Sequence, residues 1–192
     1  MEKHRRVADS QLEMVPLDRS TIDAVTAIGN EAYPPQMRMW DTVNILGGEY
    51  VLSGVRDLSF LARDKTGKFS GYCIAFLIES EVAPTDEVSM YVADVAVLPN
   101  TQGAYVGLEI AREIMSRANQ FEIDRVEFHA RESTTYRALF ESSHTQQILA
   151  EYGYTLTEHG LVDSLTWTDV DDVVTENGRL MSLQKIINTF DV

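Results

Sequence analysis

The segment from Val92 to Ala118 constrains the fold of this chain more than any other part of the sequence. It opens with the run Val92–Leu98, which is apolar except for Asp94 and has the length of a buried strand. A short loop containing Gly103 follows, and apolar residues then recur at helical spacing, at Leu108, Ile110, Ala111, Ile114, Met115 and Ala118. A strand, a glycine-containing loop and an amphipathic helix in this order predict one α/β unit.

The remaining patterns add hairpins to this unit. The turn signal Asp64-Lys65-Thr66-Gly67 separates two strand-like runs. We predict strands over Leu12–Leu17, Leu58–Arg63, Phe69–Glu79, Ser89–Leu98, Arg125–Ala130, Tyr154–Thr157 and Leu161–Thr168, the last two as a closing pair. We predict helices after Ser20, Asp41 and Gly107, and over Thr134–Glu141 and Thr145–Tyr152. Hairpins beside a strand–helix–strand unit predict a mixed sheet with helices on its faces.

The tail of the chain differs from what precedes it. We predict one domain over residues 11–169 and a C-terminal amphipathic helical extension over residues 170–192. The apolar residues of this predicted helix are Leu180, Leu183, Ile186, Ile187 and Phe190. Such a face either packs on the domain's own core or forms the contact of a homodimer.

Charge and composition limit the partners of the chain. The formal net charge is −14, and an acidic surface repels nucleic-acid phosphates and anionic lipid. No run approaches the ~20 apolar residues that cross a bilayer, and residues 1–10 lack the apolar core of a secretory signal. We therefore expect a cytoplasmic protein without nucleic-acid or membrane partners. Cys73 lies in an apolar run, which is typical of a buried thiol.

The loop between the strand and the helix is a candidate anion site. The first turn of a helix presents unpaired N–H groups and the positive end of the macrodipole, so it binds phosphate without basic side chains. Gly103 allows the backbone to approach an anion closely. The loop is not a Walker loop, because no Gly-Lys-Ser/Thr follows, and it is not a Gly-x-Gly-x-x-Gly dinucleotide fingerprint, because it has only Gly103 and Gly107. A plain tight turn remains an alternative interpretation of the same spacing.

The same loop resembles the coenzyme-binding motif of the GNAT superfamily of N-acetyltransferases. That motif is Gln or Arg, two residues, Gly, one residue, then Gly or Ala, after a strand that ends in apolar-x-apolar-Pro. Gln102 and Gly107 match its ends, and Val95–Pro99 matches the strand. Tyr105 departs from it at the central glycine. The order of elements from Leu12 to Thr168 and the junction Glu151–Tyr154 also resemble the family.

This resemblance implies a GNAT-like α/β (α+β) fold, with a mixed, mostly antiparallel central sheet and helices on both faces. It implies acetyl-coenzyme A as co-substrate, no metal, and direct attack of an amine on the thioester without an acyl-enzyme. The pantetheine arm would lie in a V-shaped opening between the strands Val92–Leu98 and Arg125–Ala130. The residues implied to contact the coenzyme are Val95, Ala96, Val97, Gln102, Gly103, Ala104, Tyr105, Val106, Gly107 and Ser143.

Three side chains are candidates for the proton transfer that an ammonium group needs before it attacks. Asp94 is a charged residue inside an apolar strand, where a lone carboxylate is costly, so it is either a catalytic group or a structural ion-pair partner. Glu127 and His129 share one face of the neighbouring predicted strand and could act as bases, contact the substrate or simply cover that face.

The leaving thiolate has no obvious acid in this sequence. Many relatives in the superfamily use a tyrosine on the late helix, and alignment on Gly153 places Leu149 at that position. Tyr136 and Tyr152 are candidate replacements, although a thiolate can also leave unassisted because its pKa is low. Ser142, Ser143 and His144 begin the late helix, where they could contact the coenzyme or cap the helix.

Three functions remain open at this stage. We expect an N-acetyltransferase whose acceptor is a small cationic amine or a peptide amine. The departures at Tyr105 and Leu149 keep a catalytically inactive coenzyme-A-binding module as the alternative. A structural α/β protein that binds no coenzyme would require the motif match to be chance.

Overall fold

The computed structural model describes residues 12–18, 20–33, 58–78, 87–101, 105–131, 142–168 and 173–186. Within these ranges, the strands are β1 (Leu12–Pro16), β2 (Phe60–Asp64), β3 (Phe69–Ile78), β4 (Ser89–Val97), β5 (Arg125–Arg131), β6 (Tyr154–Thr168) and β7 (Val173–Lys185). The helices are α1 (Ile22–Ala32), α3 (Val106–Gln120) and α5 (Ser143–Tyr152), with a short 3₁₀ turn η4 (Pro99–Thr101). The predicted helices after Asp41 and over Thr134–Glu141 lie outside the described residues.

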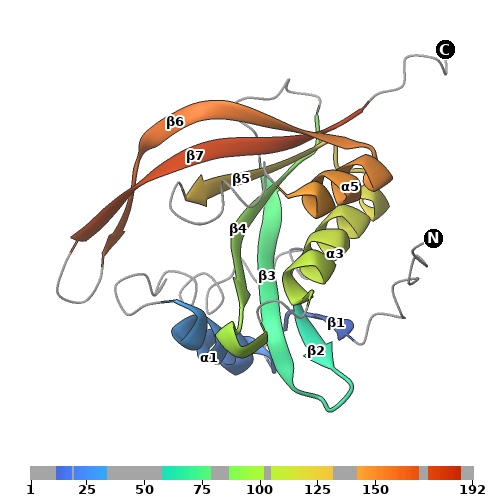
Figure 1. The fold of residues 1–192 in the computed structure, drawn as a ribbon, viewed down its shortest axis with the longest axis vertical. Coiled ribbons are helices and arrows are strands. Elements are labelled where there is room, and N and C mark those ends of the chain that lie inside the picture. The colour runs from blue at the N-terminus through green and yellow to red at the C-terminus, as the bar shows by residue number, and fades with distance from the viewer. Residues whose placement is uncertain are drawn as a thin grey trace, which may run out of the picture.

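The strands form one sheet in the order β1-β2-β3-β4-β5-β7-β6 (Figure 1). Only the β4–β5 pair is parallel among the described pairs; all the others are antiparallel. α3 connects β4 to β5, as a parallel pair requires. The predicted α/β (α+β) fold with a mixed, mostly antiparallel sheet is therefore confirmed.

Helices cover both faces of the sheet. α1 packs on β3 and β4 from one side, where Val25 and Ile28 join a cluster with Tyr72. α3 and α5 pack on the other side, where Ile110 and Ile148 belong to a larger cluster. The thiol of Cys73 lies fully buried in that second cluster, and burial raises its pKa, so it is a core residue as predicted.

The amphipathic helix predicted after residue 170 is wrong. Residues Val173–Lys185 form β7, which pairs with β5 along one edge and with β6 along the other. Met181 and Leu183 are buried two residues apart, which is the period of a strand. Hydrogen bonding on both edges overrides the helical spacing of the apolar residues, so this segment belongs to the sheet and is not a helical extension.

The predicted closing pair of strands over 154–168 is also wrong. β6 runs as one strand from Tyr154 to Thr168, and its partner is β7. The segment Glu158-His159-Gly160, interpreted from the sequence as the turn, is instead an irregularity in the register with β7. A bulge bends a strand without ending it, and its polar and glycine residues resemble those of a turn.

Gly71 on β3 is packed closely by the backbone of β4 and by a side chain of α3. A Cβ atom there would lie 2.8 Å from the Ala96 carbonyl oxygen and 2.8 Å from Ile110 Cδ1. We therefore expect Gly71→Ala to lower the free energy of unfolding by about 1–3 kcal/mol through overpacking. Urea unfolding would show a lower midpoint at an unchanged slope. Gly107→Ala is the control, because a Cβ atom at Gly107 meets nothing within 4 Å, and it should not lower the midpoint.

Candidate active site

β4 separates from β5 halfway along its length. The parallel register joins Ser89–Val92 to Arg125–Phe128 and stops there. On its other edge β4 continues with β3, but the register skips Ala93: Val92 pairs with Ala75 and Asp94 pairs with Ile74. A bulge of this kind bends a strand, so the second half of β4 turns away from β5. The opening predicted between these two strands is consistent with this register.

The bulge also decides which main-chain groups of β4 face the opening. The N–H of Leu98 donates to the Ser70 carbonyl, so this residue points its main chain toward β3. Main-chain direction alternates along an antiparallel strand, so Val97 and Val95 point away from β3. The hydroxyl of Tyr33 donates to the Val95 carbonyl oxygen at 2.9 Å, which agrees with this direction. These are the groups predicted to pair with the pantetheine arm.

Asp94 lies on the α1 face of the sheet and is 7% exposed. The hydroxyl of Tyr33 donates to its Oδ1 at 2.5 Å, and the hydroxyl of Tyr72 donates to its Oδ2 at 2.5 Å. Tyr33 follows the last residue of α1, and Tyr72 lies on β3. Two hydroxyl donors offset the cost of burying the carboxylate.

Tyr91 and His129 form a second polar pair beside the opening. The Tyr91 hydroxyl lies 2.6 Å from His129 Nδ1. Their neighbours Met90 and Val126 are buried on the α3 side, so Tyr91 and Glu127 face the opposite side of the sheet. Glu127, adjacent to His129 on β5, is 4% exposed, so it does not simply cover a solvated strand face.

The surroundings favour a neutral imidazole at His129. Burial lowers the pKa of His129, and the negative charge of Glu127 opposes that effect. Burial and the charge of Glu127 both raise the pKa of Tyr91, so its phenol keeps its proton. In the tautomer whose Nδ1–H donates to the phenol oxygen of Tyr91, the neutral imidazole of His129 can accept a proton at Nε2.

The pairing of Tyr91 with His129 could not be predicted from the sequence. This contact depends on the parallel register of β4 and β5 and on the end of their pairing, and neither can be read from one strand. Tyr33 was missed for the same reason, since it lies 61 positions from Asp94 in the chain.

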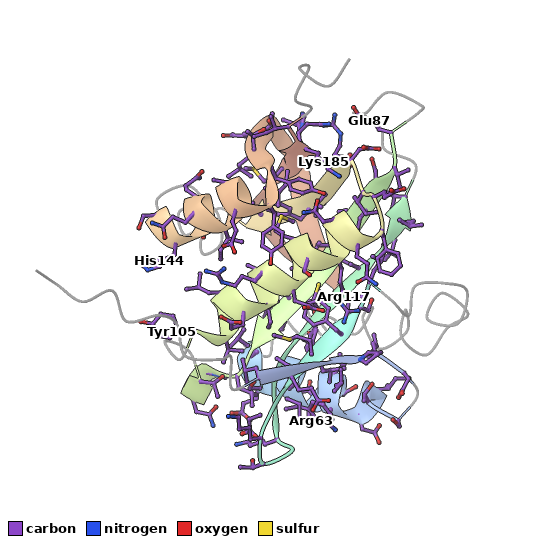
Figure 2. The ribbon with its side chains drawn as sticks, turned by 90° about the vertical axis from the view of Figure 1, so that its right-hand side faces the viewer. Arg63, Glu87, Tyr105, Arg117, His144 and Lys185 are labelled. Carbon is purple, nitrogen blue, oxygen red and sulfur yellow. The ribbon has the colours of Figure 1, made fainter. Side chains whose placement is uncertain are left out.

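The start of α3 is described only in part. Gln102, Gly103 and Ala104 lie outside the described residues, so their predicted contacts are not tested. Tyr105 has φ +62°, the left-handed region that the central glycine of the motif would adopt freely, and its side chain is 68% exposed. Figure 2 shows Tyr105 at the first turn of α3, on the same side of the molecule as His144 at the start of α5.

The late helix begins as a capped helix. Ser142 is the N-cap of α5, and its hydroxyl accepts a hydrogen bond from the Thr145 N–H at 3.4 Å. Leu149, at the position of the usual tyrosine, is 4% exposed in the core and supplies no acid. Tyr152 lies on the last turn, and burial raises its pKa. Tyr136 lies outside the described residues, and the role of Ser143 stays a prediction.

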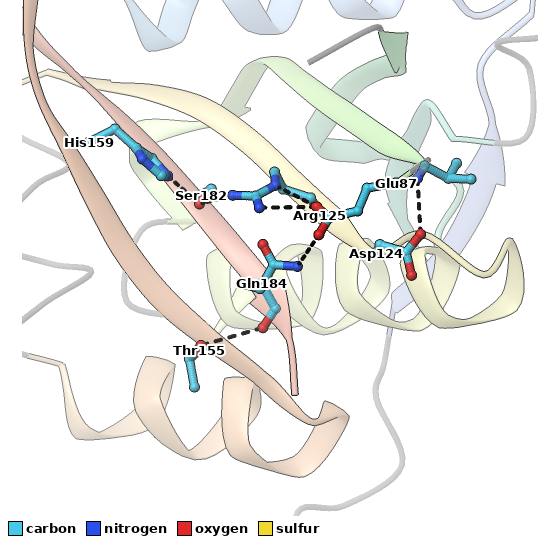
Figure 3. A network of polar contacts seen from close by, with 8 residues as sticks. Glu87, Asp124, Arg125, Thr155, His159, Ser182 and Gln184 are labelled. Carbon is cyan, nitrogen blue, oxygen red and sulfur yellow. Dashed lines mark hydrogen bonds and ion pairs between the residues drawn. The ribbon is translucent and has the colours of Figure 1, made fainter. Parts of the chain in front are cut away.

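A network behind the opening holds β5 in place (Figure 3). Arg125 Nε donates to Glu87 Oε2 at 3.0 Å, and Arg125 NH1 donates to Ser182 Oγ at 3.3 Å. His159 Nε2 lies 2.6 Å from the same Ser182 hydroxyl, and Gln184 Nε2 donates to Glu87 Oε1 at 3.3 Å. These contacts join Glu87, just before β4, to β5, β7 and β6, so they fix the strand that carries His129.

Over the part of the chain that the structure describes, no group of three or more His, Cys, Asp or Glu side chains could hold a metal ion. None of the described helices is long and apolar enough to cross a membrane.

The fold is that of known N-acetyltransferases. The ribosomal-protein-S18-alanine N-acetyltransferase from Escherichia coli matches with a TM-score of 0.64 at 14% identity, over 94% of this chain and 98% of that chain. Naa20 from Chaetomium thermophilum, in complex with a bisubstrate analogue, matches with a TM-score of 0.64 at 16% identity, over 90% and 86%.

A third match acts on a different kind of acceptor. The spermidine/spermine N-acetyltransferase SpeG from Vibrio cholerae has a TM-score of 0.59 at 15% identity, over 91% of this chain and 93% of that chain. No family model matches this sequence, and no curated protein sequence matches it. The predicted resemblance to the GNAT superfamily is thus confirmed at the level of the fold.

Proposed function

We propose that this protein is an N-acetyltransferase that transfers the acetyl group of acetyl-coenzyme A directly to a primary amine. The observation that carries the proposal is the opening itself: β4 leaves β5 after Val92, and polar side chains flank the point of separation from both strands. The fold match to acetyltransferases supports the same conclusion.

The residues at the opening fit the coenzyme. Val95 and Val97 direct main-chain groups away from β3, where the amides of an extended pantetheine arm could pair with them. The first N–H groups of α3 are donors for a pyrophosphate. Acetyl-coenzyme A supplies the acetyl group as a thioester when it is bound there.

Conversion of an ammonium group to an amide removes two protons from the nitrogen. We assign the second of these to His129, which accepts it as the new C–N bond forms and the C–S bond breaks. Its neutral imidazole and its hydrogen bond to Tyr91 suit this task. The proton leaves His129 for solvent, and the thiolate leaves as a stable anion or takes up a proton from solvent.

The acceptor class follows from charge. The net charge of −14 attracts cations, so we propose a cationic small amine or a peptide amine as the acceptor. Structural matches include enzymes named for both kinds, a ribosomal-protein alanine and spermidine. The net charge favours a cationic acceptor and does not select one amine over another.

A turnover assay separates this proposal from an inactive coenzyme-binding module. Acetyl-coenzyme A should raise the Tm of the protein, because a ligand that binds only the native state stabilises it. Free thiol should then appear when polyamines, amino acids or peptides with free N-termini are added. A Tm shift without turnover on any amine would support the inactive module, and the absence of both would reject coenzyme binding.

A further inference from the structure

Two tyrosine hydroxyls donate hydrogen bonds to the carboxylate of Asp94, which is largely buried from an approaching amine substrate. Each of its oxygens accepts a hydrogen bond from a phenol at 2.5 Å, and the residue is 7% exposed. A basic group acts on a substrate proton only within hydrogen-bond reach or through an intervening donor. Among the described residues, Tyr33 and Tyr72 are therefore the groups through which Asp94 can act in the reaction proposed above.

The two tyrosines differ in what else they contact. Tyr72 is 2% exposed, within the cluster under α1, and its hydroxyl lies 3.2 Å from where a Cβ atom would stand on Gly29. Tyr33 is half-buried, just beyond the end of α1, and its hydroxyl also contacts the Val95 carbonyl oxygen at 2.9 Å. Tyr33 alone of the pair thus links Asp94 to the edge of β4 that faces the opening.

The Tyr33 hydroxyl has one proton, and two hydrogen-bond acceptors among the described residues lie within its reach. It is 2.5 Å from Asp94 Oδ1 and 2.9 Å from the Val95 carbonyl oxygen, so its short hydrogen bond is to the carboxylate. A phenol that donates to a carboxylate keeps lone pairs on its own oxygen. That oxygen can accept a proton on one side while its own proton passes to Asp94 on the other.

We infer that Tyr33 is the relay through which Asp94 removes the first proton from the acceptor ammonium group. This inference rests on the proposed function. One N–H bond of the ammonium group breaks as its proton moves to Tyr33 Oη. At the same time the original Tyr33 O–H bond breaks, and the proton that Tyr33 carried moves to Asp94 Oδ1. The amine becomes neutral, Tyr33 ends unchanged, and the carboxylate becomes a carboxylic acid that later returns its proton to solvent. Tyr72 holds the other oxygen and takes no part in the transfer.

Two matched variants test the relay. Tyr33→Phe and Tyr72→Phe each remove one of the two hydroxyl groups that donate hydrogen bonds to the Asp94 carboxylate. We expect Tyr33→Phe to lower kcat by about 10²-fold or more, with an unchanged KM for acetyl-coenzyme A. Tyr72→Phe should lower the Tm and should lower kcat far less than Tyr33→Phe does. A purely structural role for the pair predicts instead that the more buried Tyr72 is at least as important for the rate.

The basicity of the acceptor gives the second readout. A weakly basic amine such as an O-alkylhydroxylamine is neutral at pH 7 and has no ammonium proton to lose. The defect of Tyr33→Phe should therefore disappear with that acceptor, whereas a misfolded site would be slow with both. Equal rates for the two variants, or a defect that persists with the neutral amine, would overturn the relay. Failure of the unsubstituted protein to acetylate either amine would instead reject the proposed function.

Discussion

Replacement of His129 by Gln is expected to lower the rate of acetyl transfer by about 10²–10⁴-fold, the usual contribution of a general base. Gln is similar in size and retains hydrogen-bonding groups, but it cannot accept a proton at neutral pH. Because His129 acts on the proton that leaves during bond formation, its defect should persist with a neutral amine acceptor. This persistence separates the His129 variant from the Tyr33 variant. Steady-state thiol release measures both.

The pH profile gives a further test of His129. Burial lowers its pKa, so the rate should fall only when the pH drops below the ordinary histidine range and the imidazole becomes protonated. The same fall should be absent in His129→Gln. His159→Gln is the comparison variant: His159 contacts Ser182 in the network that holds β5, so whatever its rate this variant should keep the fall at low pH. A His129 variant with normal rate and an unchanged pH profile would remove this residue from the mechanism.

Replacement of Asp94 by Asn is the second change with a large expected effect. The relay loses its proton acceptor, so the rate should fall by about 10²–10⁴-fold. An amide has one acceptor oxygen for two phenols, so the free energy of unfolding should also fall, by about 1–3 kcal/mol. The Tm shift with acetyl-coenzyme A should remain, since its predicted contacts are main-chain groups.

Two comparisons make the Asp94 result interpretable. Asp124→Asn is the control: Asp124 Oδ2 accepts from the Val88 N–H at 2.9 Å, and an Asn oxygen can do the same. If Tyr33 and Asp94 act in one relay, the double variant Tyr33→Phe, Asp94→Asn should be no slower than Asp94→Asn alone. Multiplied defects would show that the two residues act independently, and the relay would then be wrong.

Patterns within single elements were enough to predict much of the fold. The apolar stripe of α3 and the alternation on β5 are local, and the structure confirms both: Val126 and Phe128 join the cluster under α3, whereas His129 contacts Tyr91. The tail could not be predicted in the same way. Leu180 and Leu183 fit a helical period, and only the presence of β5 and β6 on both edges of β7 makes the extended form the better one.

The candidate site shows the same division. Asp94 could be identified because a charge inside an apolar strand is unusual. Its contact with Tyr72 and the pairing of Tyr91 with His129 arise from strand register and from the bulge at Ala93, and its contact with Tyr33 arises from the packing of α1 on the sheet. Side chains brought together by tertiary register leave no local pattern, so a single sequence does not reveal them.

The position of β7 between β5 and β6 has a consequence for how the chain acquires its active form. During synthesis β5 can pair with β4 only over Ser89–Val92, and its other edge stays open until residues 178–184 have been made. An unpaired strand edge is a template for association with other chains. The strand that carries His129 is therefore completed late, and a chain cut before Val173 would expose that edge to neighbouring molecules instead of merely losing a terminal appendage.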